Sequence, residues 1–199
     1  MIALVVLAAG ASSRMGAAGP KALVRGPDGR SFLERVSESA RAGGAGQVVV
    51  VLGPPHGAEI RRALPPGSSS AWNPLPDRGM LSSVQAGIAA LPAAATAALV
   101  WPVDVPLVEP ETVRAILAAH PGKIVIPCVR DPKGKLRGGH PLRIPRARFA
   151  ELAALDPERG LKALIEARPD EVERLEVADR GILVDVDTPD ELGRLFKSR

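Results

Sequence analysis

The sequence predicts an α/β fold with a mostly parallel sheet that helices cover on both faces. Short apolar runs of strand length alternate with longer segments of helical pattern along most of the chain. Consecutive β-branched residues, as in QVVVVL at 47–52, are typical of strands buried on both faces. At 199 residues the chain is long enough to bury its own core, and we expect a single domain over 1–199.

The predicted elements begin with a buried strand over 2–7, which runs directly into small residues and a glycine. Ser31 is placed to cap a helix over 32–41, and Thr188 with Pro189 is placed to begin a closing helix over 188–196. An apolar run that ends in acids predicts a further strand over 182–187. The other expected strands cover 47–52, 69–72, 95–104, 123–129 and 172–177, and the other expected helices cover 56–64, 81–91, 109–120, 145–155 and 160–167.

The segment VRDPKGKLRGGHPLRIP, at 129–145, differs in character from its surroundings. It is rich in glycine, proline and basic residues and has no strong period, so it predicts loops around short strands. We expect it to be an insertion that reaches over a site.

Composition and charge exclude several classes of function. The net charge is +4 and the cations are interleaved with acids, while aromatic residues make up 3% of the chain and tyrosine is absent. A nucleic-acid surface is therefore not expected. The single cysteine, Cys128, excludes an intrachain disulfide and a cysteine-rich metal site, and it is expected to be a small buried hydrophobic residue.

The apolar N-terminus has two interpretations, a signal peptide or a buried strand. No lysine or arginine precedes it, and it is rich in β-branched residues, so the pattern favours the strand. No segment has the roughly 18 consecutive apolar residues of a membrane span. The expectation is a cytoplasmic protein without a membrane partner.

The loop LAAGASSRMGAAGPK, at 7–21, follows the first strand and is a candidate anion site. Free backbone N–H groups at the carboxyl edge of a sheet bind anions. The loop lacks the dinucleotide pattern G-x-G-x-x-G and the P-loop pattern, but it carries a guanidinium at Arg14 and an ammonium at Lys21. Both cations suit phosphate. A structural turn with two surface cations remains the alternative.

Acids follow two later apolar runs. Asp104 ends the strand LVWPVD, and Asp185 and Asp187 end ILVDVD. One or two carboxylates together with substrate phosphates are the ligands that Mg²⁺ prefers. The alternative is that these acids cap or begin the helices that follow.

Two other groups of residues are weaker candidates. Asn73, Gly79, Ser82 and Ser83 lie at the start of a predicted helix, where they could bind an anion or a ribose or could simply cap the helix. His140 follows two glycines, and with three histidines in the chain a histidine zinc site is not expected. No nucleophile elbow G-x-S-x-G is present.

Five blocks in order, LAAGASSRMG…PK, NPLPDRGMLSSVQAGI, PVDVPLV, GGHPL and DVDTPDEL, resemble the MobA-like NTP transferases over about residues 2–195. Within that family they are most similar to the molybdenum cofactor cytidylyltransferases. The resemblance implies a Rossmann-like nucleotidyltransferase fold, similar to the GT-A fold, in a three-layer αβα sandwich with a mostly parallel mixed sheet. It also implies an enzyme that transfers a nucleoside monophosphate and releases pyrophosphate.

The same resemblance implies roles for particular residues. Leu7, Ala8, Ala9 and Gly10 would meet the base. Catalysis would involve Arg14, Lys21 and Asp104, with the two cations on the triphosphate. Asp104 and Asp187 would hold Mg²⁺. The nucleoside pocket would be lined by Asn73, Gly79, Ser82 and Ser83. The acceptor side would be formed by Gly139, His140 and Pro141.

The implied reaction is transfer of CMP from CTP to a phosphorylated acceptor such as molybdenum-molybdopterin, because two alanines in LAAG resemble the cytidylyl branch. A molybdoenzyme maturation protein is an implied partner. The alternatives are a guanylyltransferase, a sugar- or alditol-phosphate nucleotidyltransferase, and a nucleotide-binding regulatory protein without turnover. The last is left open because the segment from Arg14 to Lys21 is about two residues longer than in the family pattern.

Overall fold

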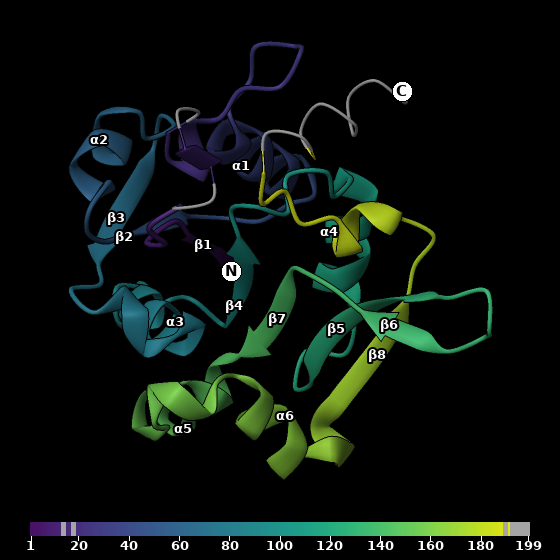
Figure 1. The fold of residues 1–199 in the computed structure, drawn as a ribbon. Helices are drawn as coiled ribbons and strands as arrows, with labels where there is room; N and C mark the ends of the chain where they lie inside the picture. Colours follow the sequence, from purple (N-terminus) through teal and green to yellow (C-terminus); the bar gives the residue numbers. More distant parts are fainter. Residues whose placement is uncertain (13–14, 17–18, 189–190, 192–199) are drawn as a thin grey trace.

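The computed structural model describes residues 1–12, 15–16, 19–188 and 191, and its centre is a mixed sheet (Figure 1). Eight strands form this sheet, in the order β3-β2-β1-β4-β7-β5-β6, with β8 paired to β5. The strands are β1 Ile2–Leu7, β2 Val48–Leu52, β3 Ser68–Trp72, β4 Ala97–Pro102, β5 Ile124–Arg130, β6 Leu136–Gly138, β7 Leu142–Pro145 and β8 Val172–Glu176.

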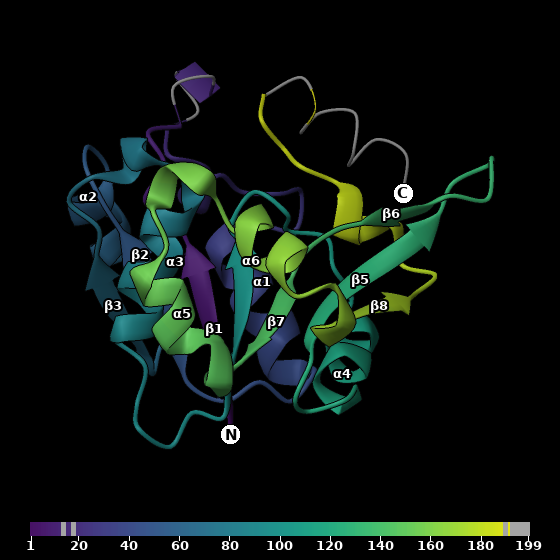
Figure 2. The same ribbon diagram turned by 90° about the horizontal axis from the view of Figure 1, so that it is seen from below.

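Helices lie on both faces of the sheet (Figures 1 and 2), which confirms the predicted α/β fold. Within the described residues, α1, α2 and α4 pack on one face and α3, α5 and α6 pack on the other. The α-helices are α1 Phe32–Ala42, α2 Gly57–Arg62, α3 Met80–Ala89, α4 Pro110–Ala118, α5 Phe149–Ala154 and α6 Lys162–Ala167. No helix in the described parts of the chain is long and apolar enough to cross a membrane.

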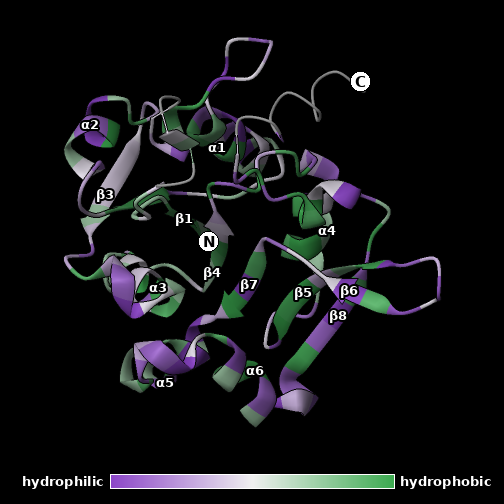
Figure 3. Cartoon of the chain, viewed as in Figure 1, coloured by the Kyte–Doolittle hydropathy of each residue, from purple (hydrophilic) through white to green (hydrophobic). Residues whose placement is uncertain are grey.

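The β1 strand shows why the sheet needs both helical layers. Leu4 and Val6 face the layer of α1 and α4, whereas Val5 and Leu7 face the layer of α3 and α5. Side chains on alternate positions of a strand point to opposite faces, so a run of apolar residues requires cover on both. Figure 3 shows the resulting hydrophobic centre, with β4, β5 and β7 largely green and β8, at the side, largely purple.

The sheet combines a parallel and an antiparallel part. β1 pairs in parallel with β2 and β4, and β2 pairs in parallel with β3. The short strands of the 129–145 segment add antiparallel pairs, because β7 lies against β4 and β6 lies against β5. The chain first extends from β1 toward β3 and then crosses back to β4 on the other side of β1. The strand order therefore reverses between β1 and β4, and ligands of open α/β sheets bind outside the carboxyl ends of strands at such a point.

One predicted strand is wrong. Residues 182–187 do not form a strand, because a 3₁₀ helix covers Arg180–Leu183. Asp179 begins that helix by accepting a hydrogen bond from the Gly181 N–H at 2.8 Å. The expected closing helix over 188–196 lies mostly outside the described residues, but Thr188 and Glu191 exchange hydrogen bonds as a helix cap does.

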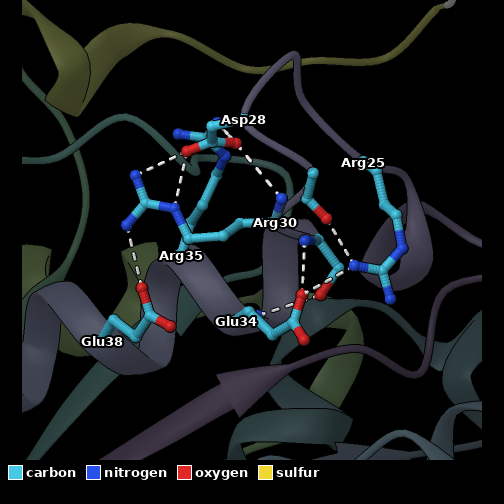
Figure 4. A network of polar contacts seen from close by, with 8 residues as sticks. Arg25, Asp28, Arg30, Glu34, Arg35 and Glu38 are labelled. Atoms are coloured by element: carbon cyan, nitrogen blue, oxygen red, sulfur yellow. Dashed lines mark hydrogen bonds and ion pairs between the residues drawn. The ribbon is translucent and has the colours of Figure 1, made fainter.

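A network of charged side chains fixes the turn between Lys21 and α1 (Figure 4). The Arg30 guanidinium donates to Asp28 at 2.6 Å and to Glu38 at 2.9 Å. At the start of α1, Ser31 accepts from the Glu34 N–H, and Glu34 accepts from the Ser31 N–H at 2.6 Å. This capping box confirms Ser31 as the helix cap.

We expect Glu34→Gln to lower the free energy of unfolding by about 0.5 kcal/mol at neutral pH. The hydrogen bond from the Ser31 N–H, with the nearby Arg25 charge, lowers the pKa of the Glu34 carboxyl. A lowered pKa stabilises the fold above the pKa of the unfolded chain, and this stabilisation is lost as the pH falls through the folded value. Urea unfolding from pH 7 to pH 3 should show the gap to wild type closing. Glu166→Gln, on an exposed flank of α6, is the control and should show a gap near zero throughout.

Candidate functional site

A pocket of about 270 Å³ opens where the strand order reverses, at the carboxyl ends of β1 and β4. The loop after β1 forms one wall, and the end of β4 with Lys21 forms the other. Backbone hydrogen bonds from Ala8 to Val51 O and from Val103 to Leu7 O fix both walls to the sheet. The lining residues are Leu7, Ala8, Gly10, Ala11, Ser12, Lys21, Ala22, Val103 and Asp104.

Among the described residues, Lys21 is the cation that lines this pocket. Its ammonium donates to Asp104 Oδ2 at 2.9 Å and to Asp187 Oδ1, so one ammonium joins the two carboxylates that the sequence singles out. The Lys21 side chain is 13% exposed. Burial lowers the pKa of Lys21, and the hydrogen bonds to the two acids raise it by more, so that the pKa lies above its ordinary value. The ammonium stays charged at neutral pH.

Ser12 positions Lys21, and the sequence interpretation missed it. Its hydroxyl oxygen accepts a hydrogen bond from the Lys21 backbone N–H at 3.0 Å. Ser12 has a φ of 52°, in the left-handed region that residues other than glycine rarely adopt. The long segment before Lys21 is also held at its middle, because Met15 is buried in the core. The additional residues therefore leave Lys21 at the edge of the sheet.

The segment that carries Asp187 is tied to the end of β4. The Val186 N–H donates to Asp104 O at 2.8 Å, which joins the two acidic positions through the backbone. Glu191 accepts from the Asp187 N–H at 2.8 Å and from the Thr188 N–H at 3.0 Å. The Glu191 carboxylate therefore fixes the backbone of the segment that carries Asp187.

The turn at Gly139 and His140 lies against the C-terminal segment that leads to Asp187. A Cβ at Gly139 would lie 2.2 Å from Ile182 O, and the His140 N–H donates to that oxygen at 2.9 Å. The His140 Nδ1 atom is buried and has no hydrogen-bond partner in the described part of the chain. Burial lowers the pKa of His140, and the charge of Asp104 opposes this shift only partly, so the imidazole is neutral at pH 7.

The four polar candidates at the start of α3 form a group of their own. Asn73 donates to Ser82 Oγ at 2.8 Å and to Ser83 Oγ at 2.9 Å, and Gly79 immediately precedes the helix with a φ of 99°. These bonds join the residue after β3 to the first turn of α3, although no side chain caps the helix. The group lies beside the first loop, because a Cβ at Gly53 would lie 2.8 Å from Asn73 O and 3.0 Å from Ala9 Cβ.

The structure therefore brings together Leu7, Ala8, Gly10, Lys21, Asp104 and Asp187. Ala9 belongs to the same loop, but its side chain is buried in the core. Pro141 follows His140 through a cis peptide bond. Arg14 lies outside the described residues. Cys128 is fully buried, as expected, and burial raises the pKa of its thiol.

The donor set of the pocket fits a hard divalent cation. Asp104 and Asp187 supply carboxylate oxygens, and a positive group already lies between them. No group of three or more His, Cys, Asp or Glu side chains in the described residues could hold a metal. Two carboxylates with additional oxygens from a substrate are the pattern of Mg²⁺ or Mn²⁺ sites, whereas zinc sites use more protein ligands.

These features fit an α/β nucleotidyltransferase fold. They are the order of the strands, the pocket at the β1–β4 crevice, and the lysine and two acids that face each other there. The chain belongs to the MobA-like NTP transferase domain family, whose model matches residues 4–172. This match confirms the family and the Rossmann-like three-layer fold expected from the sequence.

The chain is similar to two relatives, one of which has two solved structures. It is 34% identical to nicotine blue oxidoreductase from Paenarthrobacter nicotinovorans, over 96% of this chain and 95% of that protein. It is 31% identical to Rv0371c from Mycobacterium tuberculosis H37Rv, with a TM-score of 0.83 over 98% and 97% of the two chains. A structure of Rv0371c with manganese is 30% identical and has a TM-score of 0.78, over 100% and 99%.

Proposed function

We propose that this protein is a divalent-metal-dependent nucleotidyltransferase that transfers a nucleoside monophosphate, with CMP from CTP as the first candidate, to a phosphorylated small-molecule acceptor. The observation that carries the proposal is the contact of Lys21 with both Asp104 and Asp187 in a pocket at the β1–β4 crevice. One cation and two acids at the switch point of the sheet suit a triphosphate with its metal. Manganese in the Rv0371c structure supports metal use.

The reaction is an in-line displacement at the α-phosphorus of the nucleotide. An oxygen of the acceptor phosphate forms a new bond to that phosphorus, the bond to the bridging oxygen of the pyrophosphate breaks, and pyrophosphate leaves with the electron pair. The protein has to position both reactants and to offset negative charge on the leaving group, and no covalent nucleophile is needed.

Each group of residues has a proposed role in this reaction. The backbone of residues 7–10 holds the base, and Asn73, Gly79, Ser82 and Ser83 line the nucleoside pocket. Lys21, together with Arg14, binds the triphosphate. Asp104 and Asp187 would hold Mg²⁺, which would supply positive charge to the phosphates and to the attacking oxygen.

The segment at 129–145 is proposed as the acceptor side. Gly139 and His140 lie against Ile182, in the segment that leads to Asp187, and Pro141 follows them in the chain. The buried Nδ1 of His140 has no hydrogen-bond partner among the described residues. A neutral imidazole can donate to or accept from a polar acceptor without carrying charge. Molybdenum-molybdopterin is the first candidate acceptor, from the resemblance to the cytidylyl branch, and a molybdoenzyme maturation protein is the corresponding partner.

We expect His140→Gln to separate acceptor binding from nucleotide binding. Loss of one hydrogen bond to the acceptor should lower kcat/KM for transfer by roughly 5- to 100-fold. The dissociation constant for CTP with Mg²⁺, measured by calorimetry, should change by less than about twofold. Equal losses in transfer and in nucleotide affinity would contradict the acceptor role.

The proposed function is tested by pyrophosphate release with CTP, GTP, UTP and ATP under identical conditions, with Mg²⁺ and with molybdopterin-type or sugar-phosphate acceptors. Release that depends on CTP and acceptor supports the cytidylyl assignment. Preference for GTP, or for a sugar phosphate, would replace it within the same chemistry. Tight binding of Mg²⁺ and nucleotide with no release would support a regulatory protein.

The relative named as an oxidoreductase supplies a second candidate function. A redox enzyme of this fold would consume a reduced cofactor, such as NADH or NADPH, and would reduce a dye-like acceptor. The loop after β1 lacks the dinucleotide pattern, which argues against a nicotinamide dinucleotide in the usual position. Oxidation of NADH or NADPH with an electron acceptor, and no pyrophosphate release, would favour this second function.

A further inference from the structure

The Lys21 ammonium contacts both of the carboxylates that would hold the proposed metal ion. It is within hydrogen-bonding distance of Asp104 Oδ2, at 2.9 Å, and of Asp187 Oδ1. A divalent ion held by both carboxylates needs the same oxygens at about 2.0–2.6 Å. The ammonium and the ion cannot both occupy that space. Lys21 is therefore an internal cation that stands in for the metal.

The surroundings of Lys21 allow its head group to move while its backbone stays in place. The backbone N–H is held by Ser12 Oγ at 3.0 Å, and the next residue, Ala22, is buried. The ammonium itself is at the end of a flexible four-carbon chain that borders the open pocket. Rotation about its side-chain bonds would carry the ammonium from the acids toward the pocket that Lys21 lines, where the triphosphate is proposed to bind.

We propose that the Lys21 ammonium competes with the metal for the Asp104–Asp187 pair, and that it moves to the triphosphate when metal and nucleotide bind together. This inference rests on the proposed function for its metal ligands. Without nucleotide, release of the ammonium costs two charge-assisted hydrogen bonds and provides no new anionic partner. With nucleotide present, the phosphates become that partner. Metal and nucleotide therefore increase each other's affinity through Lys21.

The first experiment measures Mn²⁺ binding without nucleotide, from the electron paramagnetic resonance signal of free Mn²⁺. Lys21→Met removes the ammonium and keeps an unbranched apolar stem, so we expect at least tenfold tighter Mn²⁺ binding than in wild type. Asp104→Asn should weaken binding strongly in either background. Unchanged or weaker binding in Lys21→Met would overturn the inference, and so would unchanged binding in Asp104→Asn.

The second experiment repeats the Mn²⁺ titration with a non-hydrolysable CTP analogue. In wild type the analogue should increase Mn²⁺ affinity strongly, and in Lys21→Met the increase should be at least fivefold smaller. Equal increases in the two proteins would mean that Lys21 does not couple the two ligands, which would overturn the inference.

A third measurement distinguishes exchange from simple charge repulsion. Lysine acetylation with a water-soluble ester, read by mass spectrometry, should be slow at Lys21 in the free protein. It should become at least threefold faster with Mg²⁺ alone, and slow again with Mg²⁺ and the CTP analogue. Lys133, which is exposed, is the control and should react at one rate throughout. No change at Lys21 upon addition of Mg²⁺ would overturn the exchange.

These measurements do not require turnover. If no nucleotide and acceptor give pyrophosphate, the proposed transferase activity fails, while the three predicted results with Mn²⁺, Mg²⁺ and Lys21 would still establish the exchange. If pyrophosphate is released normally but Lys21→Met binds Mn²⁺ as wild type does, the exchange alone fails.

Discussion

Asp104→Asn should lower the rate of nucleotidyl transfer by about a thousandfold or more and leave the protein folded. Asp104 lines the pocket and contacts Lys21, and its proposed metal would neutralise charge that develops on the phosphates. A loss of about 4 kcal/mol of transition-state stabilisation corresponds to that change in rate. The measurement is pyrophosphate release with saturating CTP and Mg²⁺, together with the circular dichroism spectrum and the melting temperature.

Asp170→Asn is the matched control, because Asp170 is exposed and is not among the residues that line the pocket. It should retain full activity. An Asp104→Asn protein with activity like wild type would contradict the metal assignment. If Asp104→Asn does not fold, the same measurement is made on Asp187→Asn. Asp187 contacts Lys21 from the other side, and the same loss is expected there.

Arg143→Met should lower the free energy of unfolding by about 3 kcal/mol, which corresponds to a melting temperature lower by roughly 6–12 °C. Arg143 is in the β7 strand and is 1% exposed. Its guanidinium donates to Leu117 O at 3.1 Å, to Ala119 O at 2.9 Å and to His120 O, just where the α4 helix ends. Burial lowers the pKa of Arg143, and the charge of Glu173 opposes this shift only partly.

The expected loss is large because methionine fills much of the space but leaves the helix-end carbonyls buried and unpaired. Arg137→Met, on the exposed β6 strand, is the control and should change the free energy of unfolding by less than about 0.5 kcal/mol. A loss below about 1 kcal/mol for Arg143→Met, measured by urea unfolding, would show that water or a shifted helix end satisfies the carbonyls.

Much of the fold could be predicted because its signals are local. The valine run of β2, the strand before Gly10 and the strand that ends near Asp104 are short apolar segments between turn residues, and the structure confirms each of them. The parallel order of those strands then places the first loop and Asp104 at one edge of the sheet. The resemblance to the MobA-like NTP transferases, carried by five sequence blocks, indicated the same residues independently.

What could not be predicted depends on contacts between distant segments. The run ILVDVD has a strand pattern, but Asp179 accepts hydrogen bonds from Glu109 N and Thr112 Oγ1 and so draws this segment toward α4. Gly181 then fits against the 107 backbone, where a Cβ would lie 2.3 Å from Leu107 O. The hydrogen bond from the Lys21 N–H to Ser12 Oγ joins residues nine positions apart in a loop, and no periodic pattern in the sequence indicates it.

The buried arginine shows the same limit. The sequence analysis gives Arg143 no role of its own, because it lies in the basic segment at 129–145 that predicts loops around short strands. Only the packing of β7 against the end of α4 places it among backbone carbonyls. Charge alone does not show whether a side chain will find acceptors inside the protein.

The central claim is that the β1–β4 crevice binds a nucleoside triphosphate together with a divalent metal. A thermal-shift panel of CTP, GTP, UTP and ATP, each with and without Mg²⁺, tests it most directly. Ligand at a hundredfold excess over its Kd stabilises the folded state by about 2.7 kcal/mol, which shifts the melting temperature by several degrees. The account predicts a selective shift with CTP that requires Mg²⁺ and is lost in Asp104→Asn. No shift with any of the four nucleotides would contradict it.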